Sequence, residues 1–150
     1  DYKRLKKMLD KKPFLTANVE TGEARLITHA QALKAKTDSN PFTNKRITID
    51  CLGALEQFAR LPEVGTEDKE FSLQDISRVA GQNYFVFYDW TAIRKILTPT
   101  IQDFGGRGQG QDCEARFSWL DCFVAGLLGC FRRQGLRPNQ LKSIVKLFKD

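Results

Sequence analysis

The chain has 150 residues, of which 41% are hydrophobic and 11% aromatic, so it is long enough to form one packed domain with a substantial extension. No apolar run approaches about 18 residues, which excludes an ordinary membrane-spanning helix. The 24 Lys and Arg against 18 Asp and Glu give a net charge of +6, which favours anionic partners without identifying one.

Residues 1–12 are rich in basic side chains. The cations are Lys3, Arg4, Lys6, Lys7, Lys11 and Lys12. No apolar core of signal-peptide type follows them, so we expect a cytoplasmic protein. We interpret the cluster as a solvated tail, and non-specific attraction to phosphate is the alternative. Because the first residue is Asp1 rather than Met, we expect a chain trimmed from a longer one.

Residues 13–28 predict a β-hairpin. Two partly alternating segments flank the turn signal at residues 20–23, which contains Gly22. A short helix over residues 29–36 and a loop over residues 38–41 are expected to follow.

The next segment, residues 50–61, predicts a helix. Its apolar residues recur at helical spacing and would share one face: Leu52, Leu55, Phe58 and Leu61. Residues 62–69 are the best linker candidate. We therefore expect residues 1–65 to form an α+β accessory region. It resembles no known family, and its expected role is to pair two copies of the chain or to hold a partner.

Residues 71–90 have the pattern of a helix-turn-helix. Ser72 is the predicted N-cap of the first helix, with Asp75 three residues on, and Gly81 ends it. Its apolar face comprises Leu73, Ile76, Val79 and Ala80. Asn83 caps the second helix, and a short Gly-containing turn between two helices is typical of this motif. The alternatives are a plain helical hairpin in a core and an aromatic β-strand over residues 84–88.

The remaining chain predicts a Gly-rich loop and two more helices. The loop, residues 105–110, follows the break at Pro99. A helix then begins at Ser118, where Asp121 completes a capping box, and ends near Gly135. The apolar face of the last helix comprises Leu141, Ile144, Val145 and Phe148.

From about residue 70 to residue 150, this order of signals resembles the winged helix-turn-helix domain of the MerR family. The resemblance begins with the helix at Phe71–Gly81 and with Trp90, which closes the second helix. Ile96–Pro99 resembles the segment that enters the wing, and the wing and its exit correspond to Gly105–Arg107, Arg116–Ser118 and Asp121. Arg132–Leu136 followed by Leu141 resembles the third helix, the turn and the fourth helix of the family. The expected fold is mainly α with a small β component. Its winged helix-turn-helix spans residues 66–150 and follows the accessory region.

The resemblance implies a bacterial, nucleoid-associated transcription regulator that binds double-stranded DNA. The helix at 83–90 would enter the major groove, and the Gly-rich wing at 104–117 would lie on the backbone. The residues expected to read bases are Asn83, Tyr84, Phe85 and Tyr88. The residues expected to contact phosphates are Arg94, Lys95, Arg107 and Arg116. Phe87 and Trp90 are expected to face the core.

The aromatic residues 84–88 also support an alternative function. Exposed aromatic side chains often bind proteins, so a non-enzymatic protein-interaction module is the second reading. Residues 66–150 carry 12 basic against 10 acidic residues, a net charge of +2, which is low for tight DNA binding. Pairing of two chains through residues 1–65 and a monomeric chain are both open.

Catalysis, a metal and a cofactor are not expected. The chain has one histidine, His29, and none of the nucleophile, phosphate-loop or zinc-protease motifs. Its four cysteines are Cys51, Cys113, Cys122 and Cys130. None forms a Cys-x-x-Cys pair, which argues against zinc. Cys122 and Cys130 fall on a predicted apolar helix and are expected to be small core residues.

Overall fold

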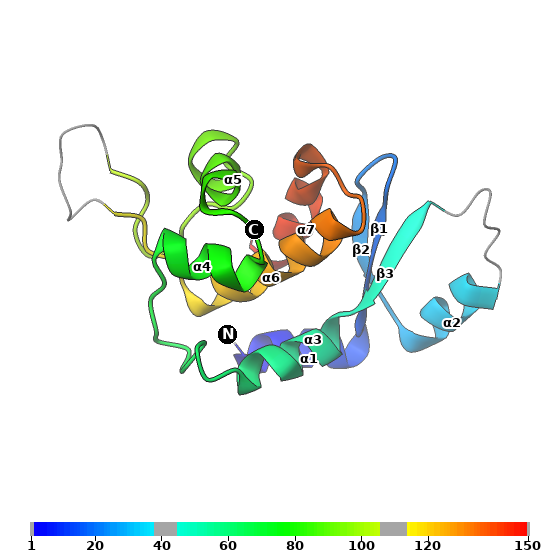
Figure 1. Cartoon of the computed structure of the whole chain (residues 1–150). Helices are drawn as coiled ribbons and strands as arrows, with labels where there is room; N and C mark the ends of the chain where they lie inside the picture. The colour runs from blue at the N-terminus through cyan, green and yellow to red at the C-terminus, as the bar shows by residue number, and fades with distance from the viewer. Residues whose placement is uncertain (1, 38–44, 106–113, 150) are drawn as a thin grey trace.

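The structure is a computed structural model, and it describes residues 2–37, 45–105 and 114–149. As predicted, the protein is mainly helical with a small β component, a three-stranded antiparallel sheet (Figure 1). The expected loop at 38–41, Cys113, and residues 106–113 of the predicted wing, including Arg107, lie outside the described residues.

The basic N-terminal segment is a helix, α1 (Tyr2–Lys11), so the interpretation as a solvated tail is wrong. Leu5 and Leu9 are spaced four residues apart and therefore share one helical face. They are 1% and 0% exposed, which anchors the helix in the core. The basic side chains occupy the remaining surface of α1, which packs beside α3 (Figure 1).

The sheet contains the predicted hairpin and one strand that was not predicted. β1 (Phe14–Asn18) lies between β2 (Ala24–Ile27) and β3 (Arg46–Asp50). The hairpin turn is stabilised by Asn18, whose Oδ1 accepts from the N–H groups of Glu20 at 2.8 Å and Thr21 at 3.1 Å. Gly22 in this turn has φ +78°, a conformation that favours glycine.

Two predicted helices flank β3 in the sequence. α2 (His29–Thr37) follows the hairpin. α3 (Cys51–Arg60) is capped by Asp50, whose Oδ1 accepts from the Gly53 N–H at 2.9 Å. Leu55 and Phe58 of its expected apolar face are buried, whereas Leu61 beyond its end is 40% exposed.

The second half of the chain is helical. α4 (Leu73–Ala80) and α5 (Tyr84–Tyr88) are the two helices predicted within residues 71–90, joined by a short turn at Gly81, and α5 continues into a π-helical turn, η1 (Asp89–Ile93). α6 (Trp119–Arg133) is buried along most of its length. The 3₁₀ turn η3 (Pro138–Leu141) and α7 (Lys142–Phe148) follow it. None of the helices in the described part of the chain is long and apolar enough to cross a membrane.

The two halves of the chain share one core. The ring of Phe58 in α3 lies 5.0 Å from Trp119 and 5.5 Å from Phe123, both in α6. Gln140 in η3 donates from Nε2 to the carbonyl oxygens of Val19 at 2.7 Å and Glu20 at 3.0 Å. These contacts join the hairpin and α3 to α6 and η3.

Candidate functional site

The helix α4 is defined by its caps. The Ser72 Oγ accepts from the Asp75 N–H at 3.1 Å, as the sequence predicted. Gly81 ends α4 with φ +67°, and its N–H donates to the Arg78 carbonyl at 3.0 Å. The Arg133 Nη1 donates to the Ala80 carbonyl at 3.2 Å, which ties the turn to the end of α6.

A glycine in α6 allows α4 to approach closely. A Cβ at Gly129 would lie 1.9 Å from the Ala80 carbonyl oxygen. No side chain fits at that distance, so the end of α4 rests directly on the backbone of α6. The orientation of the turn and of α5 beyond it therefore depends on this contact.

The second helix is anchored by its buried side and capped at its start. Phe87 and Trp90 are 0% and 1% exposed and face the core, as expected. The Asn83 Oδ1 accepts from the Phe85 N–H at 2.9 Å. Residues 84–88 are thus helical, and the alternative of a β-strand is wrong. The buried hydroxyl of Thr91 donates from Oγ1 to the Phe87 carbonyl at 2.9 Å, so its hydrogen-bonding requirement is met inside the core.

The outer side of α5 carries exposed apolar residues that we call the aromatic face. It comprises Tyr84, Phe85, Val86 and Tyr88, which are 43%, 77%, 42% and 40% exposed. The Tyr88 ring meets Phe104 edge-on, with ring centres 5.8 Å apart. A groove of about 320 Å³ lies beside these rings, and its lining also includes Ser72, Gln74 and Glu114. The aromatic face is therefore exposed to solvent and in contact with Phe104.

Several charges around the aromatic face neutralise one another. The Arg94 Nε donates to Asp89 Oδ2 at 2.7 Å, and its Nη1 donates to Asn139 Oδ1 at 3.1 Å. Arg116 lies 3.9 Å from Glu114. Lys95 is exposed, has φ +54°, and forms no ion pair within the described residues. Of the cations expected to contact phosphate, Arg94 and Arg116 carry partners and Arg107 is not described.

The described residues include the two ends of the predicted wing. Gln102 and Arg116 are antiparallel neighbours, joined by N–H···O bonds of 2.8 and 3.1 Å. Phe71 and Phe117 are paired in the same way at 2.9 Å in both directions. These short pairings bring the loop back beside the start of α4. The wing itself stays a prediction, because its tip lies outside the described residues.

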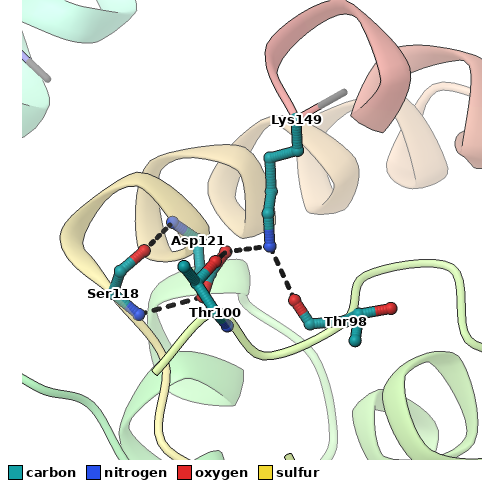
Figure 2. A network of polar contacts seen from close by, with 5 residues as sticks. All are labelled: Thr98, Thr100, Ser118, Asp121 and Lys149. Atoms are coloured by element: carbon teal, nitrogen blue, oxygen red, sulfur yellow. Dashed lines mark hydrogen bonds and ion pairs between the residues drawn. The ribbon is translucent and has the colours of Figure 1, made fainter. Parts of the chain in front are cut away.

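A buried carboxylate fixes the segment at residues 98–100 (Figure 2). Asp121 in α6 is fully buried and accepts from the N–H of Ser118 at 2.9 Å, the N–H of Thr100 at 2.9 Å and the Thr100 hydroxyl at 2.8 Å. Lys149 at the end of α7 forms an ion pair with the same carboxylate and donates to the Thr98 carbonyl at 2.6 Å. One side chain thus joins three segments that are distant in sequence.

This network was only partly visible in the sequence. The capping box between Ser118 and Asp121 was predicted, and both of its hydrogen bonds are present. The contacts to Thr100 and Lys149 were not predicted. No local pattern marks them, because these residues lie 21 and 28 positions from Asp121.

A metal site would need clustered ligands, and a thiol nucleophile at Cys51 or Cys122 would need a low pKa. The described residues contain no group of three metal-ligating side chains. Burial, and then the charge of Asp50, raises the pKa of the Cys51 thiol to about 12. Burial, and then mainly the charge of Asp121, raises that of Cys122 to about 12. A thiol with such a pKa stays protonated at neutral pH and is a poor nucleophile. Cys122 is buried, as predicted, and Cys130 is half-buried.

No family model matches the chain, and it matches no curated protein and no solved structure. The resemblance to MerR-like domains therefore stays a prediction based on the order of local signals.

Proposed function

We propose that the chain is a DNA-binding transcription regulator that places the helix at 83–90 in the major groove and the wing at 104–117 on the backbone. The observation that carries the proposal is the asymmetry of α5. Phe87 and Trp90 hold its inner side in the core, while its outer side is open to solvent. A helix supported in this way in the second position of a helix-turn-helix has the form that fits a major groove.

The outer side of α5 offers contacts to bases. Tyr84, Phe85 and Tyr88 present apolar edges that suit thymine methyl groups. Asn83 keeps its amide NH₂ for donation, since its Oδ1 already caps the helix. A bidentate contact of Asn83 with adenine would require this capping bond to break. A single donated bond to a purine N7 is the contact that leaves the cap intact.

Contacts to phosphates would come from residues beside this helix. Lys95 is exposed at the end of η1, and Arg116 lies at the base of the wing. Arg107 joins them by its position in the sequence. Arg94 would contribute through guanidinium nitrogens not used in its contacts with Asp89 and Asn139. Such contacts fix the position of the protein on DNA rather than its choice of sequence.

The proposal includes a partner and a location. The protein would act on chromosomal DNA in the cytoplasm, as a nucleoid-associated regulator. Two chains paired through residues 1–65 would read half-sites about 34 Å apart, which is one turn of B-DNA. Sedimentation with and without a duplex carrying two such half-sites would measure this pairing.

The test is the affinity for mixed-sequence duplexes as a function of salt. We expect tight binding at low salt, with a slope of log K against log salt that becomes shallower by about 0.9 for each phosphate contact removed. The test variant is Arg107→Ala with Arg116→Ala, and the matched control is Arg60→Ala with Lys142→Ala, two exposed cations outside residues 83–117. Absence of binding at low salt by the folded wild-type chain would overturn the proposal.

A second candidate function has its own supporting observation. The ion pairs Asp89–Arg94 and Glu114–Arg116 leave the aromatic face with little net charge nearby, and Phe85 is 77% exposed. A neutral aromatic surface of this kind suits a protein partner. The two functions differ in their salt dependence. Binding of a protein through Phe85 and Tyr88 would change little with salt, whereas binding of DNA would weaken steeply.

A further inference from the structure

A second surface, formed by α1, β2 and α7, lies away from α5. In Figure 1, α1 and α5 lie on opposite sides of the molecule. The surface is a groove of about 650 Å³, which we call the cationic groove. Its lining residues are Arg4, Lys7, Met8, Lys11, Lys12, Arg25, Leu26 and Leu147.

The cations of this groove form no ion pairs within the described part of the chain. Its five basic side chains are all exposed, none has an ion-pair partner within the described residues, and the lining contains no Asp or Glu. Nearby cations behave differently. Lys6 on another face of α1 pairs with Glu56 at 3.7 Å, and Arg46 pairs with Glu23 at 2.7 Å. Like charges gathered without compensation repel one another, and an anionic partner would relieve that repulsion.

The floor of the cationic groove is aliphatic. Met8, Leu26 and Leu147 are half-buried and packed against the core. No aromatic side chain is among the lining residues, so the groove offers no surface on which bases of a single strand would stack. A membrane surface is also a poor fit. The apolar face of α1 is occupied, because Leu5 and Leu9 are already buried.

We propose that the cationic groove binds an acidic, amphipathic helix of a partner protein. Arg4, Lys7 and Lys11 follow the spacing i, i+3 and i+7, so they form a row along one face of α1 about 10 Å long. Carboxylates at the same spacing on a partner helix would face this row. Aliphatic residues on the adjacent side of that helix would cover Met8, Leu26 and Leu147. This is the helix-in-groove mode of recognition, with a floor that a flexible methionine can adapt.

The first experiment uses a fluorescein-labelled probe peptide of about 14 residues, long enough to span the row as a helix, with Glu on one face and Leu on the next. Fluorescence anisotropy would measure its affinity for the full chain. Two control probes replace all Glu by Gln or all Leu by Ser. We expect the first probe to bind at least about tenfold more tightly than either control, because both the charge and the apolar floor contribute. Equal binding of the three probes would overturn the proposal.

The second experiment tests whether the probe binds at the cationic groove. The variant Lys7→Glu with Lys11→Glu reverses two charges of the row. The matched control, Arg60→Glu with Lys142→Glu, makes the same change in net charge at exposed positions outside the lining. We expect the first variant to bind at least about tenfold more weakly and the control to stay within about twofold. Met8→Gln tests the floor without changing charge and is expected to weaken binding about fivefold. Circular dichroism would confirm that each variant is folded.

The proposal is independent of DNA binding by α5, and one competition separates the two. A mixed-sequence duplex is added to the complex of chain and probe. We expect it to leave the probe bound in the variant Arg107→Ala with Arg116→Ala. Displacement of the probe in that variant, together with loss of duplex binding in the Lys7→Glu, Lys11→Glu variant, would identify the groove as a phosphate site. That result would overturn the proposal.

Discussion

The aromatic face and the cationic groove differ in how their charges are balanced. Beside the aromatic face, Arg94 and Arg116 have acidic partners from their own neighbourhood. Around the cationic groove, Lys7, Lys11 and Arg25 have none among the described residues. The outer side of α5, which is the proposed DNA-contacting surface, is therefore the more neutral of the two surfaces.

The unpaired positive charge and the projecting apolar side chains therefore lie on two different surfaces of the molecule. The aromatic face projects from a helix anchored by Phe87 and Trp90 and offers large apolar side chains to its partner. The cationic groove is recessed and offers three ammonium and two guanidinium groups around a small aliphatic floor. Binding at the groove should therefore depend strongly on salt. Binding at the aromatic face gains its salt dependence only if the wing and Lys95 contact phosphates.

We expect the largest loss of stability from removal of the buried carboxylate of Asp121. Asp121→Ala removes the carboxylate that accepts from Ser118 and Thr100 and leaves Lys149, 15% exposed, without its partner. We expect the free energy of unfolding to fall by about 3–5 kcal/mol, because a nearly buried charge is left uncompensated. Urea denaturation would measure this loss.

The matched control for Asp121 is Asp75→Ala. Asp75 occupies the same N3 position in α4 but is exposed. We expect the control to lose less than about 1 kcal/mol. Equal losses in the two variants would contradict a structural role for the network in Figure 2.

The second prediction concerns the position of α4 on α6. A Cβ at Gly129 would lie 1.9 Å from the Ala80 carbonyl oxygen, so Gly129→Ala forces the two helices apart. We expect a loss of about 2–3 kcal/mol in the free energy of unfolding and weaker DNA binding, since α5 would shift with α4. Thermal and urea unfolding, with duplex titration, would measure both effects.

Gly126, one turn earlier in α6, provides the control. A Cβ there would meet nothing within 4 Å. Because Ala favours a helix over Gly, Gly126→Ala should stabilise the chain by about 0.5–1 kcal/mol. A stabilising effect of Gly129→Ala would show that the close contact between α4 and α6 is wrong.

The third prediction compares one buried thiol from each half of the chain. Burial raises the pKa values of Cys51 and Cys122 from 9.0 to about 12. Below about pH 9 both thiols are protonated in the folded and the unfolded chain. Above it, the unfolded chain loses these protons first, so the free energy of unfolding falls by about 1.4 kcal/mol per pH unit for each thiol until the folded thiol also ionises.

Urea denaturation between pH 8 and pH 10 would measure this dependence. Each thiol is expected to contribute a loss of about 1–2 kcal/mol over that range. Cys51→Ala should remove one part of the slope and Cys122→Ala a similar part. An unchanged slope in the double variant would mean that other groups cause the loss.

Two substitutions that should barely change stability test whether the aromatic face and the cationic groove bind their partners independently. Phe85→Ala and Lys11→Ala each remove a side chain that extends into solvent. Both should change the free energy of unfolding by less than about 0.5 kcal/mol. Phe85→Ala should weaken binding at α5 alone, and Lys11→Ala should weaken binding at the groove alone. If either variant weakened binding at both surfaces, the two would not be independent.

The sequence determined the elements whose signals are local. Ser72 with Asp75, Gly81, Asn83, and Ser118 with Asp121 marked helix ends that the structure places where they were expected. The buried positions of Phe87 and Trp90 also followed from the sequence. Caps and turns depend on hydrogen bonds between residues two to four positions apart, so composition and spacing are sufficient to predict them.

Only the tertiary structure decided the features that depend on contacts between distant residues. The strand Arg46–Asp50 forms because β1 provides hydrogen-bond partners 28 to 36 positions earlier. The helix α1 is held by burial of Leu5 and Leu9 against other elements. The pairing of Arg94 with Asn139 and the position of Lys149 beside Asp121 likewise required the folded chain. Packing therefore decides which basic side chains of the described residues form ion pairs. The spacing of charges along the chain does not fix the distance between them in space.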